Sequence, residues 1–267
     1  MTEVLIESKK NESLSRIRAL KEKKYRKEYG QFFLEGQTLF FEALSAGLVP
    51  SAVVLSLSAS ASLQARVRAA LSEMEVRVLV VEEDLYLSLS AEHAPQGVLA
   101  VFSVRDLLDL SQNGIRFEKE RYIILEKMQD PGNVGTMLRS AAAFGYRGAI
   151  LCASADLFSP KTVRACMGAL FRLELLLCAS TEEAFALARA RGLKVYTTSP
   201  HAEKKVSDAD YTSPFALLFG NEGAGASDEA LSLCDEVLTI PMQGMESLNA
   251  AGACAVALYE SVRGEVV

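Results

Sequence analysis

An amide and an arginine stand where a predicted strand passes into a predicted helix, within Leu125–Gly145, LEKMQDPGNVGTMLRSAAAFG. Arg121–Met128 is a short apolar run that suits a buried parallel strand, a Pro-Gly turn follows it, and Thr136–Phe144 has helix-forming composition. We therefore expect Asn133 and Arg139 at and just inside a helix N-terminus, where anions and polar groups are favoured. Alone, the segment also fits an ordinary strand-to-helix connection.

Two later segments have the same kind of organisation. Phe215–Ser227, FALLFGNEGAGAS, is an apolar strand that runs into a glycine-dense loop. Ile240–Glu260, IPMQGMESLNAAGACAVALYE, contains a strand end, a loop broken by proline, and a helix. The glycine loop is not a Walker phosphate loop, because no Gly-Lys-Ser/Thr follows it. On its own it also fits a plain loop in which Ser227 caps a helix and Asp228 and Glu229 occupy its first turn.

In this order and spacing, the three segments closely resemble the three motifs of the SpoU/TrmH branch of the SPOUT class, the trefoil-knotted RNA ribose 2′-O-methyltransferases. The motifs lie within residues 121–267, and a weaker resemblance to the family's substrate-binding domain covers QFFLEGQTLFFEAL and APQGVLAVF. The resemblance implies a C-terminal SPOUT-type α/β domain with a deep trefoil knot and a largely parallel sheet. It also implies a small N-terminal L30e-like α/β domain, and a homodimer formed through the SPOUT domain.

The resemblance further implies S-adenosyl-L-methionine as the cofactor. Glycines let a chain turn tightly and bring main-chain N–H and C=O groups against a ligand, which suits an adenine and a ribose. The residues that match the family's cofactor site are Phe219, Gly220, Gly223, Ile240, Met242, Leu248 and Asn249.

Arg139 matches the arginine of the family's first motif. Methyl transfer to a ribose requires that the 2′-oxygen be held in line with the methyl group and that its proton be removed. Since a guanidinium stays protonated near neutral pH, a simple general-base role is disfavoured. We expect Arg139 to clamp an RNA phosphate and to stabilise the developing 2′-alkoxide, with a phosphate oxygen as a further proton acceptor.

Four other polar residues complete the expected catalytic set. Asn133 and Asn249 match motif asparagines that orient the ribose or the arginine. Glu222 is expected to pair with Arg139 or Asn133, and the alternative is a merely exposed loop charge. Ser247 either contacts the substrate or caps the last helix, and as a single role we expect the cap.

The chain departs from the family pattern directly after Asn249. Ala250-Ala251-Gly252-Ala253-Cys254-Ala255 stands where the family commonly has branched residues and a serine. A glycine inside a helix costs about 1 kcal/mol of helix propensity. We expect close backbone packing around Gly252 in return, against either a dimer partner or the knotted strands.

The net charge of −6 conceals a strongly basic N-terminal segment. Between Arg16 and Lys27, seven basic residues stand against one acid, whereas residues 203–267 hold eleven acids and three bases. Such a cluster binds phosphate backbones through counterion release. The alternative is a solvated amphipathic helix, because Leu14, Ile17 and Leu20 keep a helical spacing. The predicted RNA-binding residues are Arg16, Arg18, Lys21, Lys23, Lys24, Arg26 and Lys27.

Composition excludes several other classes of protein. The chain has 267 residues, of which 50% are hydrophobic and 23% charged, as in globular proteins of two modest domains. It contains no apolar run of the ~20 residues that span a membrane, and MTEVLIESKKNES has no signal-peptide pattern, so we expect a cytoplasmic protein. Five cysteines without CxxC spacing and only two histidines favour reduced core thiols over disulfides or a metal site.

The pattern of apolar runs divides the chain into four parts. We expect a basic helical segment over 1–30, an L30e-like RNA substrate-binding domain over 31–103, a linker over 104–120 and the SPOUT domain over 121–267. In the last part, strand signals alternate with helices, which favours a parallel sheet. They lie near Tyr122–Glu126, Ala149–Cys152, Glu174–Leu177, Lys194–Thr198, Ala216–Phe219 and Val237–Ile240.

These features predict an S-adenosylmethionine-dependent RNA methyltransferase that acts on a ribose 2′-hydroxyl. The separate N-terminal domain favours ribosomal RNA over transfer RNA as the substrate. One alternative is a non-catalytic RNA-binding or ribosome-assembly protein on the same fold, and another is a methyltransferase that acts on a base nitrogen. A nucleotide-dependent oxidoreductase is disfavoured because no N-terminal GxGxxG is present.

Overall fold

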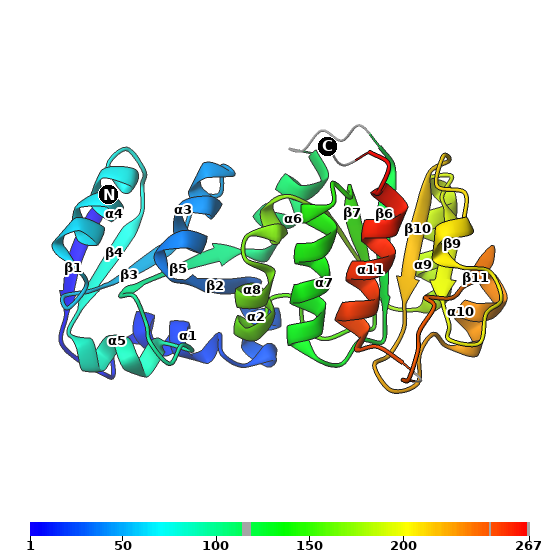
Figure 1. Cartoon of the computed structure of the whole chain (residues 1–267). Helices are drawn as coiled ribbons and strands as arrows, with labels where there is room; N and C mark the ends of the chain where they lie inside the picture. The colour runs from blue at the N-terminus through cyan, green and yellow to red at the C-terminus, as the bar shows by residue number, and fades with distance from the viewer. Residues whose placement is uncertain (114–118, 246, 266–267) are drawn as a thin grey trace. The chain divides into compact units, whose positions relative to one another are not determined.

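The computed structural model describes residues 1–113, 119–245 and 247–265 (Figure 1). The chain divides into two compact units. The first unit comprises Met1–Leu110 and Phe158–Arg164, and the second comprises Ser111–Leu157 and Ala165–Val267. Among the described residues, no helix is both long enough and apolar enough to cross a bilayer.

The first unit is built on a mixed five-stranded sheet in the order β1-β4-β3-β5-β2. Strand β4 pairs in parallel with β1 and β3, whereas β5 is antiparallel to both β3 and β2. The strands are β1 (Thr2–Ile6), β2 (Gln31–Glu35), β3 (Ala52–Ser56), β4 (Arg77–Val81) and β5 (Val98–Ser103). The helices are α1 (Glu12–Ala19), α2 (Lys23–Tyr29), α3 (Gln37–Ser45), α4 (Ala61–Leu71) and α5 (Glu83–Leu89), and α6 (Val104–Asn113) begins in this unit and ends in the second.

The N-terminal segment belongs to this unit and is not a separate helical arm. Strand β1 pairs with β4, and α1 buries Leu14, Ile17 and Leu20 in the same core as β3 and β4. The helical spacing of these three residues therefore marks a core face, as the sequence indicated. The expected helix over 1–30 is replaced by a strand and two helices, because Leu20 ends α1 and Lys23 begins α2.

Residues 104–120, expected to be a linker, contain α6 over Val104–Asn113. Ser103 Oγ accepts a hydrogen bond from the Asp106 N–H at 3.2 Å, which is the contact that a helix-capping serine makes. Leu107 is fully buried, so the helix contributes to packing. The predicted turn at Asn113-Gly114 extends beyond the described residues.

The second unit contains a parallel six-stranded sheet in the order β11-β9-β10-β6-β7-β8. Its strands are β6 (Arg121–Glu126), β7 (Gly148–Cys152), β8 (Glu174–Cys178), β9 (Lys194–Thr198), β10 (Phe215–Phe219) and β11 (Glu236–Leu238). Its helices are α7 (Pro131–Ala143), α9 (Thr181–Ala190), α10 (Asp228–Leu233) and α11 (Ala250–Val262), with 3-10 turns η1 (Ala169–Phe171) and η2 (Val206–Asp208). Helix α8 (Pro160–Cys166) contains the division between the units. The parallel sheet confirms the fold class predicted from the sequence, and the trefoil knot stays a prediction.

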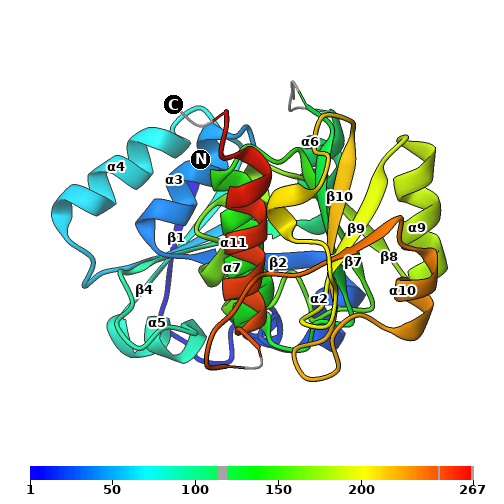
Figure 2. The ribbon, with the colours of Figure 1, turned by 45° about the vertical axis from the view of Figure 1, so that its right-hand side comes forward.

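The order of the strands places a switch point between β6 and β10. From β6 the chain continues to β7 and β8 on one side, whereas β10, β9 and β11 extend the sheet on the other side. Loops that follow parallel strands meet at the carboxyl edge of a sheet, and ligands bind in the crevice where the order reverses. Helices α7 and α11 lie side by side (Figure 2). The loops after β6 and β10, which belong to the first and second predicted motifs, therefore leave the sheet at this crevice.

Candidate active site

A cavity of about 490 Å³ lies at the carboxyl ends of β9, β10 and β11. Its walls are Thr198–His201 after β9, Phe219–Ala226 after β10, and residues between β11 and α11. Among the residues predicted for the cofactor, Phe219, Gly220, Gly223, Ile240, Met242 and Leu248 all line it. The second and third motifs, which are distant in sequence, therefore form one concave surface.

Gly220 is the residue at which this loop tolerates no side chain. A Cβ placed there would lie 2.1 Å from the Gly225 carbonyl oxygen and 2.3 Å from the Ala226 nitrogen. Both neighbours are main-chain atoms and have no side-chain freedom with which to move away. By contrast, a Cβ on Gly223 would lie 3.6 Å from Asn221 Oδ1, an ordinary contact. The two glycines thus have different roles, although the sequence alone treats them alike.

Asn221 holds the glycine loop in shape through its side-chain amide. Its Oδ1 accepts hydrogen bonds from the Gly223 and Ala224 N–H groups at 2.9 and 3.1 Å, and its Nδ2 donates to the Lys127 carbonyl at 3.1 Å. One side chain thereby joins the loop after β10 to the loop after β6. Sequence reasoning did not select Asn221, although Asx turns of this kind are common in glycine-rich loops.

Glu222 connects the cavity to the start of α7. Its carboxylate accepts hydrogen bonds from the N–H groups of Gln129 and Asp130 at 3.0 and 2.9 Å, and from Asn133 Nδ2 at 3.2 Å. Desolvation raises the pKa of Glu222, but these N–H donors outweigh it and the net pKa is lowered. Of the two partners expected for Glu222, the structure has Asn133.

Helix α7 begins five residues earlier than the sequence indicated. Pro131 occupies its first turn, where its fixed φ and missing N–H are tolerated, and Asp130 Oδ1 caps the Gly132 N–H at 3.1 Å. Asn133 therefore lies in the first turn, as expected. Arg139 does not lie just inside the N-terminus, because it is the ninth of 13 residues. It is exposed on α7 and has no ion pair among the described residues.

Asn249, and not Ser247, caps α11. Asn249 Oδ1 accepts hydrogen bonds from the Ala251 and Gly252 N–H groups at 3.0 and 3.4 Å. This corrects the helix-capping role expected for Ser247, which lies two residues before the cap and lines the cavity. An asparagine satisfies the first N–H groups of a helix as well as a serine does.

The alternative interpretation of the end of the glycine loop, in which Ser227 caps a helix, is also correct. Ser227 Oγ accepts from the Ala230 N–H at 3.2 Å and caps α10, with Asp228 and Glu229 in the first turn. The Ser227 N–H also donates at 3.0 Å to Glu126, a buried carboxylate at the end of β6. Desolvation raises the pKa of Glu126, yet its hydrogen bonds with Ser227 and Thr181 outweigh that effect and the net pKa is lowered. Capping and cavity formation are thus properties of one loop.

The sequence interpretation missed Thr198–His201, which forms a wall of the cavity. The sequence contained one signal for this segment, because it lies at and directly after the end of the predicted strand Lys194–Thr198. Residues that follow a parallel strand lie at the same edge as those that follow its neighbours. Because β9 pairs with β10, this segment faces the glycine loop.

The small residues of α11 leave part of the helix surface uncovered. Gly252 is exposed, and an added Cβ would meet nothing within 4 Å. The close packing expected around Gly252 is therefore not made by the described residues of this chain. Val256 and Tyr259, one and two turns further along the helix, are 43% and 47% exposed. Together Gly252, Val256 and Tyr259 form an exposed and mostly apolar face of the helix.

The basic segment divides into exposed cations and cations that hold the fold. Arg26 is buried, and its guanidinium donates to the Leu20 and Lys21 carbonyls at 2.6 and 2.7 Å, which corrects its expected role as a phosphate contact. Lys21 Nζ donates to the Ser90 carbonyl at 2.6 Å, and burial lowers the pKa of Lys21. Arg18 donates to Ser88 Oγ at 3.1 Å. The exposed members of the predicted set are Arg16, Lys23, Lys24 and Lys27.

Two tyrosines lie among these exposed cations. The rings of Tyr25 and Tyr29 are 5.8 Å apart between centroids. The Arg16 guanidinium lies 4.4 Å from the Tyr29 centroid, and Lys24 Nζ lies 5.4 Å from that of Tyr25. Aromatic rings interleaved with cations are a common surface for unpaired nucleotides, because bases stack while phosphates meet charge. The sequence interpretation did not include the tyrosines.

Two family models match this chain. The SpoU rRNA Methylase family model matches residues 120–259, which include β6, the glycine loop and most of α11. The MRM3-like substrate binding domain model matches residues 11–100 in the first unit.

Individual relatives agree with these matches over most of the chain. The chain is 31% identical to the 23S rRNA (guanosine(2553)-2′-O)-methyltransferase RlmP of Bacillus subtilis, with 95% of this chain and 97% of that protein covered. It is 35% identical to the 23S rRNA (uridine(2479)-2′-O)-methyltransferase of Streptomyces viridochromogenes, covering 74% and 71%. The crystal structure of an AdoMet-bound rRNA methyltransferase from Sinorhizobium meliloti superimposes with a TM-score of 0.87 at 32% identity over 99% of both chains. The motifs, the cavity they form and these matches show that the chain belongs to the SpoU rRNA methylase family.

Proposed function

We propose that this protein transfers the methyl group of S-adenosyl-L-methionine to a ribose 2′-hydroxyl of ribosomal RNA. The observation that carries the proposal is the cavity whose glycine-loop wall is joined through Glu222 to Asn133 of α7. The cavity side of this junction suits a nucleoside cofactor, and the α7 side carries the first motif, to which we assign catalysis. The relatives from Bacillus subtilis and Streptomyces viridochromogenes are named as 23S rRNA 2′-O-methyltransferases, which supports both the reaction and the substrate.

The residues of the cavity fit S-adenosyl-L-methionine. A volume of about 490 Å³ lies within the range of small-ligand and cofactor sites. The close approach of Gly220 to Gly225 brings main-chain groups to the cavity, while Phe219, Ile240 and Leu248 supply apolar walls. When bound, the cofactor supplies an electrophilic methyl group on a sulfonium.

Arg139 and Asn133 act on the RNA. The Arg139 guanidinium is exposed and free of ion pairs among the described residues, so it is available to a phosphate and to the oxyanion that develops at the 2′-oxygen. Asn133 donates to Glu222 through Nδ2, which fixes its amide and directs its Oδ1 to the ribose. Ser247 lines the cavity and contacts the substrate.

The non-catalytic alternative is not favoured, because the glycine loop and the Glu222–Asn133 contact are both intact. A base-nitrogen methyltransferase is disfavoured by the ribose chemistry of the relatives. Because the proposed substrate is ribosomal RNA, we place the enzyme in the cytoplasm.

We infer that two copies of the protein associate through α7 and α11. Gly252 lowers the helix propensity of α11 by about 1 kcal/mol, and the described part of the chain makes no contact that would compensate. The apolar face of Gly252, Val256 and Tyr259 lies beside α7, where the Phe144 and Tyr259 rings are 6.0 Å apart. A second copy of the same face would cover these residues.

Calorimetry and methyl mapping test the proposed function. The full chain should bind S-adenosylmethionine and its demethylated product, because the cavity is open in the structure. Ribosomal RNA from cells that lack the gene should lose one or more 2′-O-methyl sites that cells carrying it possess. If neither compound gives a heat of binding, with or without ribosomal RNA, the proposed methyltransferase activity is refuted. An unchanged map of 2′-O-methyl sites would refute it as well.

Replacing Lys23, Lys24 and Lys27 together by Ala should weaken binding to ribosomal RNA and flatten its salt dependence. Each lost phosphate contact should reduce the slope of log K against log salt by about 1. The three side chains are exposed on α2, and Ala favours a helix, so the fold should persist. A matched control variant has Lys194, Lys204 and Arg263, three cations of the second unit, replaced by Ala. If the two triple variants show equal slopes of log K against log salt, the α2 cations do not contact RNA, and α2 is only a solvated amphipathic helix.

A further inference from the structure

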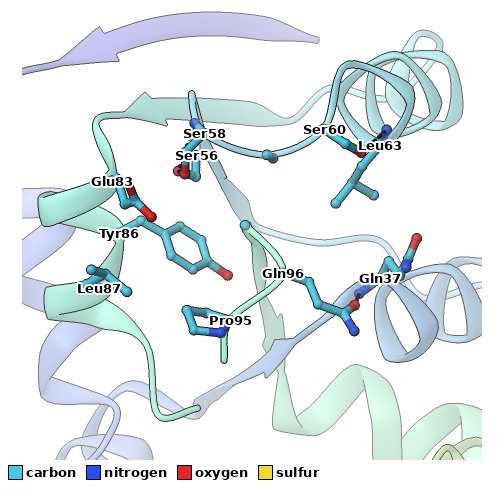
Figure 3. A pocket seen from close by; sticks show the side chains of 12 residues that line it. Gln37, Ser56, Ser58, Ser60, Leu63, Glu83, Tyr86, Leu87, Pro95 and Gln96 are labelled. Carbon is cyan, nitrogen blue, oxygen red and sulfur yellow. Dashed lines mark hydrogen bonds between the residues drawn. The ribbon is translucent and has the colours of Figure 1, made fainter. Parts of the chain in front are cut away.

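A second cavity, of about 360 Å³, lies in the first unit at the carboxyl ends of its parallel strands (Figure 3). Strands β2, β3 and β4 run in the same direction, because β5 is antiparallel to β2 and β3 and β3 is parallel to β4. The segments that follow these strands, at Gln37, Ser58 and Glu83, all line the cavity. This is the edge of an α/β sheet at which ligands bind.

One wall of this cavity is apolar. Figure 3 shows the Tyr86 ring pointing into the space, with Pro95 and Leu87 beside it. Leu87 is 47% exposed, so its side chain is accessible at the cavity. The Tyr86 hydroxyl donates to Glu35 Oε1 at 3.3 Å, and burial together with Glu35 raises the pKa of Tyr86. The hydroxyl and the ring are thus committed to the fold, because Tyr86 is buried, and the apolar surface that a ligand can reach is that of Leu87 and Pro95.

The opposite wall offers hydrogen-bonding groups in fixed positions. Gln96 Oε1 accepts from the Gln37 N–H at 2.9 Å, which orients the amide of Gln96. Its Nε2 has no hydrogen-bond partner in the described ranges and can donate into the cavity. The Ser58 hydroxyl lies 2.8 Å from the Ser56 hydroxyl and lines the same space. Gly97, with φ of +87°, brings the start of β5 against Ala59 and closes the floor.

The charges around the cavity exclude a phosphate from its interior. Among the described residues that line the cavity, Glu83 is the charged one, and its charge is negative. A cation lies next to the opening instead, where Arg66 donates to Gln37 Oε1 at 3.3 Å and stacks 4.4 Å from the centroid of Phe41. A neutral, flat group with donors and acceptors on its edge fits the interior, and an anionic group fits the exterior. Nucleotides have this distribution of chemistry.

We propose that this cavity receives an unpaired nucleobase of the substrate RNA. The base lies against Leu87 and Pro95, its edge meets Gln96 and Ser58, and the phosphate that follows it meets Arg66. The inference rests on the proposed function, since it identifies part of the substrate that the first unit recognises. A base held here gives the unit sequence or loop specificity, which exposed lysines alone do not supply.

Two variants test the cavity by different means. Ser58→Leu narrows it, and Ser56, which is buried, keeps the Ser58 N–H as its hydrogen-bond donor, so the fold should tolerate the change. Gln96→Ala removes the oriented amide. Each should weaken binding to ribosomal RNA from cells that lack the gene about tenfold. Neither should change the salt slope, because no phosphate contact is lost. The matched controls are Ser62→Leu and Gln112→Ala, which lie outside the cavity and should bind as the wild type does.

A second experiment distinguishes RNA from free nucleosides as the source of the bound base. Saturation-transfer NMR with adenosine, guanosine, cytidine and uridine is recorded in the presence of saturating S-adenosylhomocysteine, which blocks the cofactor cavity. A nucleoside signal that Ser58→Leu abolishes, together with weaker RNA binding, supports the proposal. Loss of that signal with unchanged RNA affinity overturns the RNA source, and wild-type RNA affinity in both cavity variants without a nucleoside signal overturns the site.

These outcomes are distinct from failure of the proposed function. A protein that binds no cofactor and leaves the methyl map unchanged refutes the methyltransferase, whatever the cavity binds. A methyltransferase that works normally in Ser58→Leu and Gln96→Ala, with unaltered RNA affinity, refutes only the cavity.

Discussion

Arg139→Ala should lower the single-turnover rate of methyl transfer to ribosomal RNA about 100-fold to 1000-fold, the usual effect of removing one preorganised charge-stabilising donor. Affinity for S-adenosylmethionine and the Tm should stay close to wild type. The structural reason is that the cavity proposed for the cofactor is formed by the loops after β9, β10 and β11, whereas Arg139 is exposed on α7. Rates are measured at saturating RNA, with RNA and cofactor binding determined separately.

Arg139→Lys is the informative companion to this variant. An ammonium keeps the charge but cannot make the planar, two-pronged contact with phosphate and ribose oxygens, so it should restore little of the rate. Full activity in Arg139→Ala would remove the residue from the catalytic set. A variant that unfolds would instead identify Arg139 as a structural residue, contrary to its exposure.

Gly220→Ala should abolish measurable cofactor binding, with a loss of at least about 100-fold. The new Cβ would lie 2.1 Å from a main-chain oxygen, so the loop must move, and the loss of two cofactor hydrogen bonds of about 1.5 kcal/mol each gives that factor. The Tm should fall as well, because the same loop is anchored to Lys127 and Glu126. Calorimetry with S-adenosylhomocysteine and thermal unfolding measure the two effects.

Gly223→Ala is the matched control, since it makes the same chemical change in the same loop where the structure has room. Its cofactor affinity and Tm should remain near those of the wild type. If both alanine variants bind the cofactor equally well, the loop is not the wall of the cofactor site.

The sheet and the general position of the site could be predicted because strand patterns and glycine turns are local features of the sequence. The strand near Ala216–Phe219 and the loop after it are visible in one short segment, and the structure places them as predicted. The parallel order then brings the loops after β9, β10 and β11 to one edge. The segment Thr198–His201 and Asn221 were overlooked there, because neither carries a residue pattern that signals a ligand on its own.

Other features depended on contacts that a linear pattern does not contain. Arg26 has the same composition signal as its basic neighbours, yet a helix break at Leu20 exposes carbonyls that its guanidinium satisfies. Asn249 and Ser247 are both good helix caps, and the choice between them depends on where the preceding loop ends. Strand β1 was missed because its residues are mostly exposed and only pairing with β4 defines it.

The carboxylate of Glu222 joins the proposed cofactor site to the proposed RNA site, so we expect binding at one site to affect binding at the other. It lines the cofactor cavity, and it also holds the main chain of Gln129 and Asp130, from which α7 starts. A displacement of the glycine loop on cofactor binding would therefore move Asn133, the residue that we propose contacts the RNA. Linkage requires the effect to be reciprocal, and coupling free energies of this kind are about 1–3 kcal/mol. In the proposed arrangement, RNA and cofactor change the affinity of each other by the same factor, and replacing Glu222 should reduce that factor.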